Sequence, residues 1–580
     1  MYVQKLVIKN FRCFDKEGME IDFENGVTGI VGKNGAGKTS IVDAINLVFG
    51  REYFQNKINE RDFNNLANDI KDKIEITAYT QYPFFVSTEV AYTVGTSGYR
   101  QTAQVLIACK GFKLTIKRRE KAERILDDPY TIDRFAIPMD GAINSELYEK
   151  VVSENEKPVI KAVLSPAVGY YNISFQLKSG EVRQTRLFEY QLTYNPSKYK
   201  KFPIAYFLDK NREKEVSSSY SMLSKILTDV HWRYKKTQNG NATDINDKYN
   251  ALASQLREVD AKSKLINSIN ATINAIACDD GEYTIDFLDT NEPYKSAFIS
   301  KNLPDRQLIP SNLGSGYHVL FAYALARYIF ELEKEPIIFL IDEPEMHLHI
   351  DWQLKLFQKF IEDKDIQIIY STQSENFLSL KHWNKIRVLK DCVVFPKNET
   401  LEELTTVDSR SYPIKEIIQD YADRNLHVST FLRDNLELLF SQKCILVEGP
   451  AEKYALPKLL NLLDCDISRY SVSVVPVWGK GKMKLYQMIC KCFGANYYTL
   501  YDKDIKDGET FDNDKENQYI ENNAANGHIS SFSKSFESSL GVDGFQKVVK
   551  KTDEISSKEE LAQELNSILS GIKTFIENLT

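Results

Sequence analysis

The stretch Gly32-Lys-Asn-Gly-Ala-Gly-Lys-Thr39 fits the pattern GxxxxGK(S/T) of a phosphate-binding loop without a mismatch. It follows the apolar run 27–31, which predicts a buried strand, and precedes residues 40–49, which predict a helix. In this context the glycines let backbone N–H groups and the helix N-terminus face the phosphates of a nucleotide, so the stretch predicts an ATP site. The candidate ATP-binding residues are Gly32, Asn34, Gly35, Gly37, Lys38, Thr39 and Ser40.

The chemistry of this site needs cations and carboxylates beside the loop. Lys38 can neutralise the β- and γ-phosphates, and the Thr39 hydroxyl can bind Mg²⁺. Residues 337–345 (IIFLIDEPE) predict an apolar strand that ends in two carboxylates. Asp342 can hold the same Mg²⁺, and Glu343 is the candidate catalytic base for the water that attacks the γ-phosphate.

These motifs, together with Leu313-Gly-Ser-Gly-Tyr-His318, resemble the ABC-type ATPase domain of SMC, RecF and overcoming-lysogenization-defect (OLD) proteins over about residues 1–390. Taken alone, LGSG is also an ordinary loop. The resemblance implies that two ATPase domains enclose the nucleotide, with Lys38 of one copy facing Ser315 and Gly316 of the other. It therefore implies a homodimer or a homotetramer.

One residue departs from the pattern of these ATPases, which usually have a histidine after a Ser-Thr pair. In this sequence the stretch 368–374 reads IIYSTQS, so Gln373 stands at that position as a further nucleotide-binding candidate. A glutamine can hydrogen-bond a γ-phosphate but cannot carry a proton as an imidazolium does. We therefore expect slow turnover, with ATP acting more as a clamp than as a fuel.

A second group of acidic residues lies in the last quarter of the chain. Residues 444–448 (CILVE) predict a strand ending in Glu448, with Glu452 four positions later, and residues 497–504 (YYTLYDKD) predict a strand ending in two more carboxylates. Carboxylates at such strand ends suit Mg²⁺, Mn²⁺ or Ca²⁺. Two ions could activate water and stabilise the leaving oxygen of a phosphodiester. Taken separately, EGPAE and DKD are more often surface turns.

With the basic stretch Val477-Trp-Gly-Lys-Gly-Lys482 between them, these strands resemble the Toprim fold of topoisomerases, primases and OLD nucleases, over about residues 440–580. The resemblance implies a signature glutamate, a DxD pair and a further glutamate, for which Glu537 is the best match. It also implies a downstream lysine, a role for which Lys547, Lys550, Lys551 and Lys558 compete. The candidate catalytic and metal-binding residues are Glu448, Glu452, Asp502, Asp504 and Glu537.

The order of predicted strands and helices places the chain in the α/β class. A polar segment with apolar residues at helical spacing interrupts the ATPase pattern, and it resembles the dimerisation arm of the family in position. The predicted domains are an ABC-type ATPase domain in two parts (1–215 and 281–395), a helical dimerisation arm (216–280), a linker (396–439) and a Toprim domain (440–580).

Charge and composition limit the partners. The net charge of -7 argues against a protein coated in basic residues, so contact with DNA has to come from a local patch. Residues 113–124 and 480–484 concentrate positive charge, the second beside Trp478 and Tyr486, which could stack on bases or sugars. For the first stretch, a solvated surface is an equally good interpretation.

The sequence predicts a cytoplasmic protein without membrane contact. No apolar run approaches the roughly 20 residues that cross a bilayer, and the first residues alternate like a strand rather than a signal peptide. The 8 cysteines show no paired CxxC spacing, which argues against a disulfide framework and a zinc ribbon.

An ABC-type ATPase followed by a Toprim domain is the arrangement of OLD proteins, whose relatives include the nuclease of the Gabija anti-phage system and some retron effectors. The resemblance implies an ATP-regulated, metal-dependent DNA endonuclease, a nickase or a double-strand cutter, in anti-phage defence. It also implies a companion helicase, reverse transcriptase or noncoding RNA. Two alternatives stay open: a RecF- or SMC-like DNA-binding repair factor without cleavage, and a nuclease held in check by a partner RNA or protein.

Overall fold

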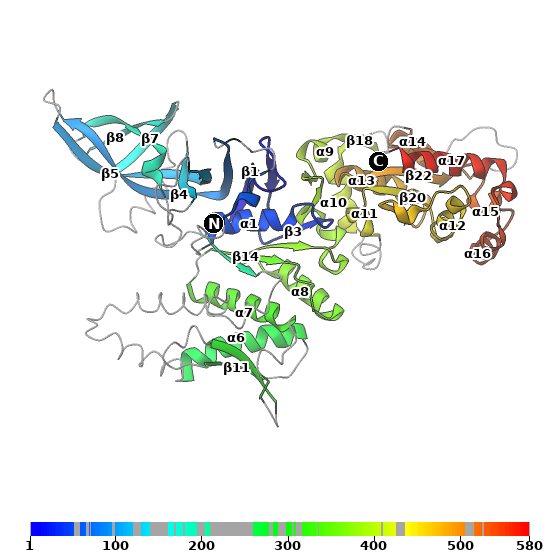
Figure 1. The fold of residues 1–580 in the computed structure, drawn as a ribbon, viewed down its shortest axis with the longest axis horizontal. Helices are drawn as coiled ribbons and strands as arrows, with labels where there is room; N and C mark the ends of the chain where they lie inside the picture. Colours follow the sequence, from blue (N-terminus) through cyan, green and yellow to red (C-terminus); the bar gives the residue numbers. More distant parts are fainter. Residues whose placement is uncertain are drawn as a thin grey trace. The chain divides into compact units, whose positions relative to one another are not determined.

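The chain divides into two compact units, of which the first comprises Met1–Gly29 and Gly37–Thr372 and the second Ile30–Ala36 and Gln373–Thr580. Figure 1 shows the computed structural model, coloured along the sequence. The structure describes residues 2–50, 58–64, 69, 71–94, 99–119, 129–139, 160–167, 170–177, 180–193, 203–208, 259–277, 282–287, 297–303, 307–308, 316–333, 336–407, 410–424, 435–504, 515–524 and 527–578.

A large, mainly antiparallel sheet occupies the N-terminal part of the first unit. Its strand order is β2-β1-β4-β5-β7-β8-β9, with β6 paired to β5. Along β4 buried and partly exposed residues alternate, as expected for a sheet with one face on a core. The strands are β1 (Val3–Lys9), β2 (Met19–Asp22), β4 (Lys73–Val94), β5 (Tyr99–Arg118), β6 (Tyr130–Pro138), β7 (Ile160–Ala167), β8 (Tyr170–Gln176) and β9 (Val182–Leu187).

A second sheet carries the predicted ATP-binding motifs, in the order β10-β14-β15-β3-β16-β17. Strands β14 and β15 are parallel neighbours and are buried at every position, which is typical of a sheet covered by helices on both faces. Helices α1 and α7 both pack on β10 and β14, and they lie on opposite sides of these strands in Figure 1. The strands are β3 (Val27–Gly32), β10 (Ile204–Leu208), β14 (Ile337–Asp342), β15 (Gln367–Thr372), β16 (Ile386–Lys390) and β17 (Val393–Phe395).

The helices of the first unit frame this sheet. Helix α6 packs along α7 and on the first strand of a small antiparallel sheet, β11-β12-β13. Of the predicted arm, residues 216–258 lie outside the described residues, and α6 forms most of the remainder. The elements are α1 (Lys38–Phe49), α6 (Val259–Ala277), α7 (Gly316–Glu333), α8 (Ile350–Glu362), β11 (Glu282–Phe287), β12 (Ala297–Asn302) and β13 (Gln307–Leu308).

A four-stranded parallel sheet, β21-β20-β22-β23, forms the centre of the second unit. Every residue of β20 is buried, because its side chains alternate between two cores. Cys444 and Leu446 pack on the side of α10 and α13, whereas Ile445 and Val447 pack on the side of α12, α16 and α17. The strands are β20 (Lys443–Val447), β21 (Val472–Pro476), β22 (Asn496–Asp502) and β23 (Ile529–Phe532).

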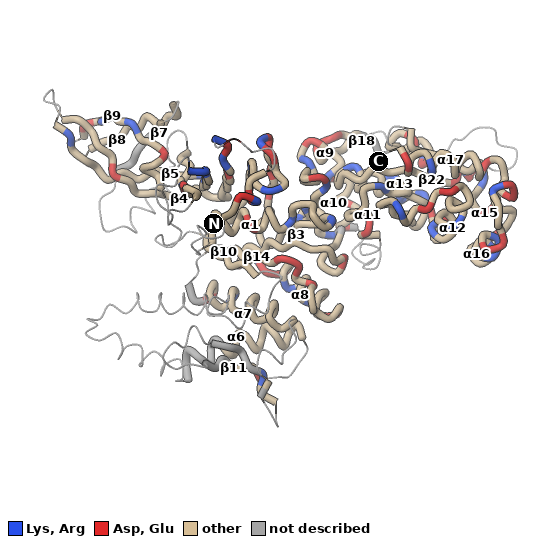
Figure 2. Tube along the Cα trace, in the orientation of Figure 1, with Lys and Arg blue, Asp and Glu red and all other residues tan. Residues whose placement is uncertain are grey.

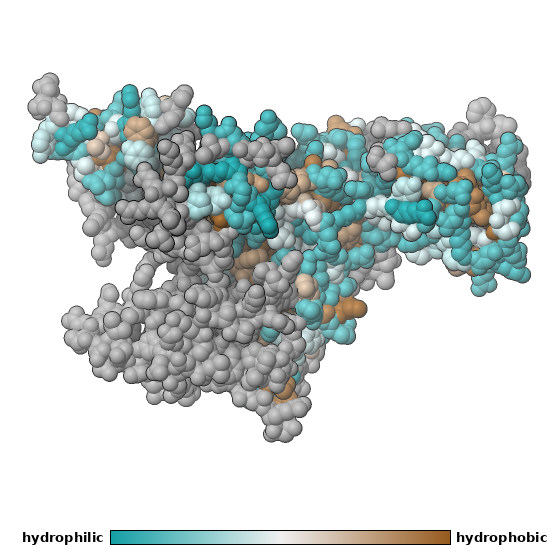
Figure 3. All heavy atoms as spheres, viewed as in Figure 1, coloured by the Kyte–Doolittle hydropathy of each residue, from teal (hydrophilic) through white to brown (hydrophobic). Residues whose placement is uncertain are grey.

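Helices cover both faces of this sheet, as an α/β fold requires. On the face shown in Figure 3 the described surface of these elements is mainly hydrophilic, with apolar residues in small separate groups. The helices are α12 (Pro450–Asn461), α13 (Met483–Cys492), α14 (Lys515–Asn522), α15 (Phe536–Ser539), α16 (Phe545–Glu554) and α17 (Gln563–Glu577).

The segment between the two predicted domains, residues 396–439, contains regular structure. Strands β18 (Leu404–Val407) and β19 (Arg410–Pro413) form a hairpin, and helix α10 (Ile414–Arg424) packs on α13. Two short helices, α9 (Asn398–Glu402) and α11 (Glu437–Phe440), lie in the same segment. Apolar residues of α10 belong to the core on the α13 side of the sheet.

The structure confirms the predicted α/β class and the strands that precede each predicted motif. Short 3₁₀ helices connect the larger elements, at Glu60–Asp62, Glu189–Leu192, Glu375–Phe377, Leu380–Lys385, Ile467–Arg469, Lys480–Lys482 and Lys558–Glu560. Within the described part of the chain, every helix is too short or too polar to span a bilayer.

A buried carboxylate anchors helix α7 to the end of α8. The side chain of Asp363 is only 1% exposed; it accepts a hydrogen bond of 2.8 Å from the Tyr323 hydroxyl and lies 3.5 Å from the Arg327 guanidinium. Burial raises the pKa of Tyr323, and the neighbouring Asp363 carboxylate adds to the increase. This contact fixes the helix whose first residue is Gly316.

Replacing Tyr323 with Phe should lower the stability of the first unit by about 1–3 kcal/mol, because a buried carboxylate loses a donor. The measurement is the shift in thermal unfolding against the wild-type chain. Tyr328→Phe on the same helix is the matched control, because no hydrogen bond of its hydroxyl is found among the described residues. Equal shifts for both variants would contradict this assignment.

Candidate nucleotide and metal sites

The phosphate-binding loop has the backbone geometry that its glycines predict. Gly35 and Gly37 have φ values of 80° and 102°, in the left-handed region that residues with a Cβ rarely adopt. At Gly32 a Cβ would lie 2.7 Å from the carbonyl oxygen of Leu389, so this position tolerates no side chain. The loop therefore leads directly into the N-terminus of α1, which begins at the buried Lys38.

The predicted Mg²⁺ residues of the ATP site lie together. Strand β14 ends at the buried Asp342, and the Thr39 hydroxyl lies 3.1 Å from its Oδ2. Ser371 at the end of β15 donates a hydrogen bond to the other carboxylate oxygen. Glu343 follows with a φ of 50°, and its N–H donates to the Ser371 carbonyl at 3.0 Å. Because β14 and β15 are parallel neighbours, their carboxyl ends bring these groups to one sheet edge.

The remaining residues predicted for this site are placed as follows. Gln373 comes directly after β15 and is exposed, and Asn34 is exposed in the loop, whereas Ser40 is buried in α1. Gly316 is the first residue of α7, where a Cβ would meet the carbonyl oxygen of His347 at 2.7 Å. Ser315 lies outside the described residues.

In the second unit, Glu448 and Asp502 meet at the carboxyl edge of the parallel sheet. Glu448 follows β20, Asp502 ends β22, and the Glu448 Oε1 accepts the Asp502 N–H at 2.8 Å. The Asp502 Oδ1 in turn accepts the N–H of Phe536 at 3.1 Å, at the start of α15. These two hydrogen bonds join three segments that are far apart in the sequence.

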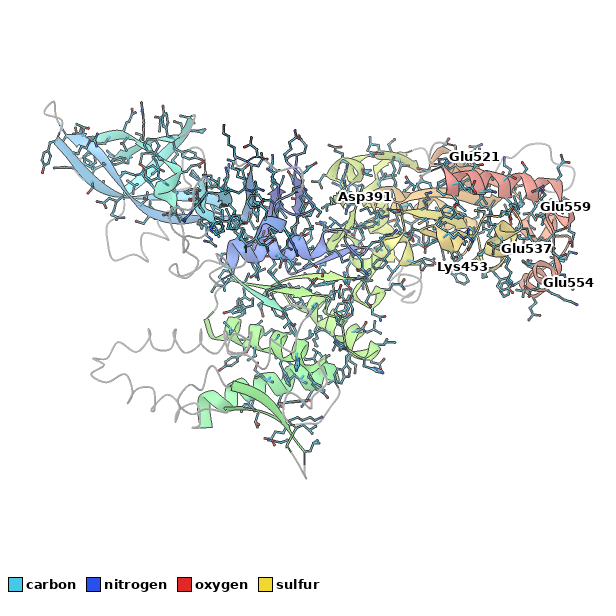
Figure 4. All side chains as sticks on the ribbon, in the orientation of Figure 1. Asp391, Lys453, Glu521, Glu537, Glu554 and Glu559 are labelled. Carbon is cyan, nitrogen blue, oxygen red and sulfur yellow. The ribbon has the colours of Figure 1, made fainter. Side chains whose placement is uncertain are left out.

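The charges of the other predicted carboxylates act on Asp502. Burial raises the pKa of Asp502 to about 8, and the charges of Glu448, Glu452, Glu537 and Asp504 add to the increase. Burial likewise raises the pKa of Glu452 to about 7, with contributions from Glu537 and Glu448. Figure 4 labels Glu537 on the side of the sheet where α12 and α15 lie. The structure therefore brings all five predicted acidic residues into one electrostatic group.

A basic residue borders this group. Lys480 Nζ lies 3.3 Å from Asp504 Oδ2, and the Asp504 side chain is 62% exposed. Burial raises the pKa of Glu448; Asp504 and Glu537 raise it further, while Lys480 opposes the increase. Asp504 itself has a φ of 54°, so the DKD segment turns sharply after the strand.

The acidic group fits a divalent cation in its chemistry. Among the described residues, no three Asp, Glu, His or Cys side chains are already gathered as a metal-ligand set. However, buried carboxylates that raise one another's pKa carry an unfavourable negative charge, which a bound cation would compensate. Carboxylate oxygens are also the donors that hard divalent ions prefer. The residues present therefore suit such an ion, which would draw them together.

The predicted aromatic contacts of the basic stretch are partly wrong. Tyr486 is fully buried, and its hydroxyl lies 3.2 Å from Asn435 Nδ2, so it cannot stack on a base. Lys484 lies over the ring of Tyr519 at 4.8 Å. Trp478 is 47% exposed and remains available. The physical reason is the helical register of α13, which turns Tyr486 toward the core.

Some residues of the two sites escape motif analysis. Ser371, which donates a hydrogen bond to Asp342, belongs to the Ser-Thr pair before Gln373. Its position at the end of a predicted strand could have indicated this contact, because that strand is the neighbour of β14. The backbone N–H of Phe536 and the contact of Lys480 with Asp504 depend on tertiary structure and leave no local signal.

Comparison with known families agrees with this division of sites. The family model for the AAA ATPase domain matches residues 1–378, and that for the TOPRIM domain of overcoming lysogenization defect-like proteins matches residues 439–504. The chain belongs to this ATPase family and is an OLD-type ATPase–Toprim protein. The first match includes the phosphate-binding loop and Asp342. The second includes Glu448, Glu452, Asp502 and Asp504, whereas Glu537 lies beyond it.

Three relatives match the chain at low identity. The OLD nuclease of Thermus scotoductus is 23% identical over 523 residues, which cover 87% of this chain and 82% of the relative. The Old nuclease of Escherichia phage P2 is 28% identical, covering 51% of each chain. Endonuclease GajA of Bacillus cereus is 21% identical, covering 80% of this chain and 68% of the relative. The ATPase and Toprim domains together imply the use of a nucleotide and of a divalent metal.

The raised pKa values predict an unusual pH dependence without metal. Asp502 and Glu452 stay protonated in the fold up to about pH 8 and about pH 7, whereas in the unfolded chain they release their protons near about pH 4. Between these values the folded state binds more protons, so its stability falls as the pH rises. In EDTA the thermal unfolding temperature of the second unit should therefore decrease from about pH 5 to about pH 8.

Asp502→Asn should remove much of this decrease, and a divalent cation should reverse it. The control is Asp553→Asn, because the salt bridge with Lys458 lowers the pKa of Asp553 and places its titration below this range. An unfolding temperature that rises with pH in EDTA would refute the electrostatic grouping.

Proposed function

We propose that the chain is an ATP-regulated, divalent-metal-dependent DNA endonuclease of the OLD type, a nickase or a double-strand cutter, that acts in anti-phage defence. The observation that carries the proposal is the acidic group at one sheet edge, in which the charges of four further carboxylates act on Asp502. The names of the relatives support it, since all three are nucleases and GajA is an endonuclease. A DNA-binding factor that does not cut would have no need of this acidic group.

At the nuclease site, Glu448, Glu452, Asp502, Asp504 and Glu537 would hold Mg²⁺, or alternatively Mn²⁺ or Ca²⁺. The ion would supply an activated water and charge stabilisation of the leaving oxygen. The chain itself orients the ligands. Glu448 uses one oxygen for the Asp502 N–H, and Asp502 uses one for the Phe536 N–H, so each carboxylate is held by one oxygen and keeps the other for a cation.

At the ATP site, the phosphate-binding loop and Lys38 would hold the phosphates, Thr39 and Asp342 would hold Mg²⁺, and Glu343 would serve as the catalytic base. We further propose a homodimer or homotetramer in which Ser315 and Gly316 of one copy face the nucleotide of another. The proposed domains keep the boundaries predicted from the sequence, with the dimerisation arm at 216–280. The protein's companion in defence would be a helicase, a reverse transcriptase or a noncoding RNA.

Supercoiled plasmid incubated with the full chain and Mg²⁺ or Mn²⁺, with and without ATP, tests the nuclease. Asp502→Ala should reduce cutting by more than the about 10- to 100-fold that loss of an outer-shell metal partner costs, because a ligand at the centre of the site is lost. Asp553→Ala, an exposed aspartate on α16 in the same unit, should cut at the wild-type rate.

Cutting by Asp502→Ala at the wild-type rate would contradict the proposed nuclease site, whereas a defence phenotype in cells that Asp502→Ala leaves unchanged and Lys38→Ala abolishes would instead indicate an ATP-dependent DNA-binding factor. A parallel measurement on Lys38→Ala separates the two sites, since this change removes the proposed phosphate contact and leaves the five carboxylates of the nuclease site in place. Plasmid gels with this variant show whether ATP activates or restrains cutting.

Gln373 predicts slow ATP turnover. Steady-state phosphate release by the wild-type chain should stay below about 1 per second, the lower end of ordinary enzyme turnover, because an amide cannot carry a proton. Gln373→His should accelerate release, and Glu343→Gln should abolish it. Wild-type release of many molecules per second would exclude the role of ATP as a clamp.

A further inference from the structure

The glycine loop, defined here as residues 477–482, is tied to the metal-binding edge of the Toprim sheet. The N–H of Val477 donates to the Val447 carbonyl at 2.8 Å, and the N–H of Gly479 donates to the Glu448 carbonyl at 2.9 Å. Gly479 has a φ of 109°, which directs the chain from β21 into the next helix. The backbone of the loop is therefore fixed relative to Glu448.

Lys480 projects from this loop into the acidic group. Its side chain is only 12% exposed, its ammonium lies 3.3 Å from Asp504, and its charge also acts on Glu448. The ammonium thus lies beside Asp504, a carboxylate to which the proposed function assigns a divalent cation. A cation bound to Asp504 would repel the ammonium, because two positive charges would then lie beside one carboxylate.

We propose that Lys480 is an exchangeable ligand: its ammonium holds Asp504 while no divalent cation is bound, and it transfers to a phosphodiester of the DNA strand when a cation takes Asp504. This inference rests on the proposed function. A phosphodiester drawn to the metal would supply the anion that the displaced ammonium needs.

The surroundings of the glycine loop favour the binding of a DNA strand. A Cβ at Gly479 or Gly481 would meet no atom of the structure within 4 Å, so the outer side of the loop is open. Trp478, which is 47% exposed, offers an aromatic face beside it for an unstacked base. Lysines and arginines are interspersed with acidic residues along this unit in Figure 2, so local groups have to supply its affinity for phosphate.

The signature of the exchange is an effect on DNA binding that depends on metal. Binding of a labelled duplex to the full-length chain is measured by fluorescence anisotropy, in EDTA and in Ca²⁺. In EDTA, Lys480→Met should change the affinity little, because the wild-type lysine is held by Asp504. In Ca²⁺ the same variant should bind DNA about tenfold more weakly or worse, since one charge-assisted contact is lost.

The matched control is Lys482→Met, which removes a charge two positions along the same loop. Its effect should be similar in EDTA and in Ca²⁺, because no carboxylate exchange is assigned to it. A loss of affinity by Lys480→Met that is equal in the two buffers, or absent in Ca²⁺, would overturn the proposal. Lys480→Gln provides a second neutral variant, and the thermal unfolding of both is compared with wild type so that misfolding is detected.

A second measurement uses the metal alone. Mn²⁺ binding is titrated without DNA or nucleotide, and Lys480→Met should bind Mn²⁺ several-fold more tightly than wild type, because a competing cation is gone. Weaker binding would show that Lys480 supports the metal site, and would overturn the exchange. Neither measurement requires cutting. A wild-type chain that cuts no plasmid while both signatures appear would refute the proposed function and leave this inference standing.

Discussion

The constraint on which the second unit depends is the burial of like charges at one edge of a parallel sheet. Glu448 and Asp502 are adjacent because β20 and β22 are parallel neighbours, and α12 and α15 bring Glu452 and Glu537 to the same edge. A fold gains nothing in stability from such a group, since desolvation and mutual repulsion both oppose it. A divalent cation bound at the proposed site would offset both of these costs.

The ATP site also lies at the carboxyl edge of parallel strands, but different groups contact its central carboxylate. Asp342 also ends a buried parallel strand, but its two carboxylate oxygens contact the hydroxyl groups of Thr39 and Ser371. The difference follows from the ligands. A nucleotide brings several negative charges of its own to a cation, so the protein needs to add few. A phosphodiester brings a single charge, so the protein has to provide the rest.

The sequence predicts those features of the structure that local motifs encode, but not those that depend on tertiary contacts. The phosphate-binding loop and the acidic strand ends are local patterns, and the structure places their strands as predicted. The long antiparallel strands β4 and β5 carry no chemical motif, and their pairing is set by contacts that the sequence alone does not identify. For the same reason the contact of Lys480 with Asp504 could not be predicted. Tyr486 was misassigned because polarity of the neighbouring residues says little about the buried face of a helix.

The segment between the two predicted domains contributes to a hydrophobic core, which its polar sequence does not reveal. The core on the α13 side of the Toprim sheet includes Val31, the residue before the phosphate-binding loop, together with Ile414 and Ile418 of α10. In the loop itself, Lys33 donates a hydrogen bond to Ser471, which directly precedes β21.

Packed cores respond to displacement as units rather than by local compression. A nucleotide that moves the phosphate-binding loop would therefore repack the core in which Cys444 and Leu446 of β20 lie, only a few residues from Glu448. The proposed regulation by ATP thus requires no separate relay between the nucleotide and the carboxylates. The core that contains both Val31 and β20 would supply the physical route, and the loop that carries Lys480 continues from β21, the strand beside β20.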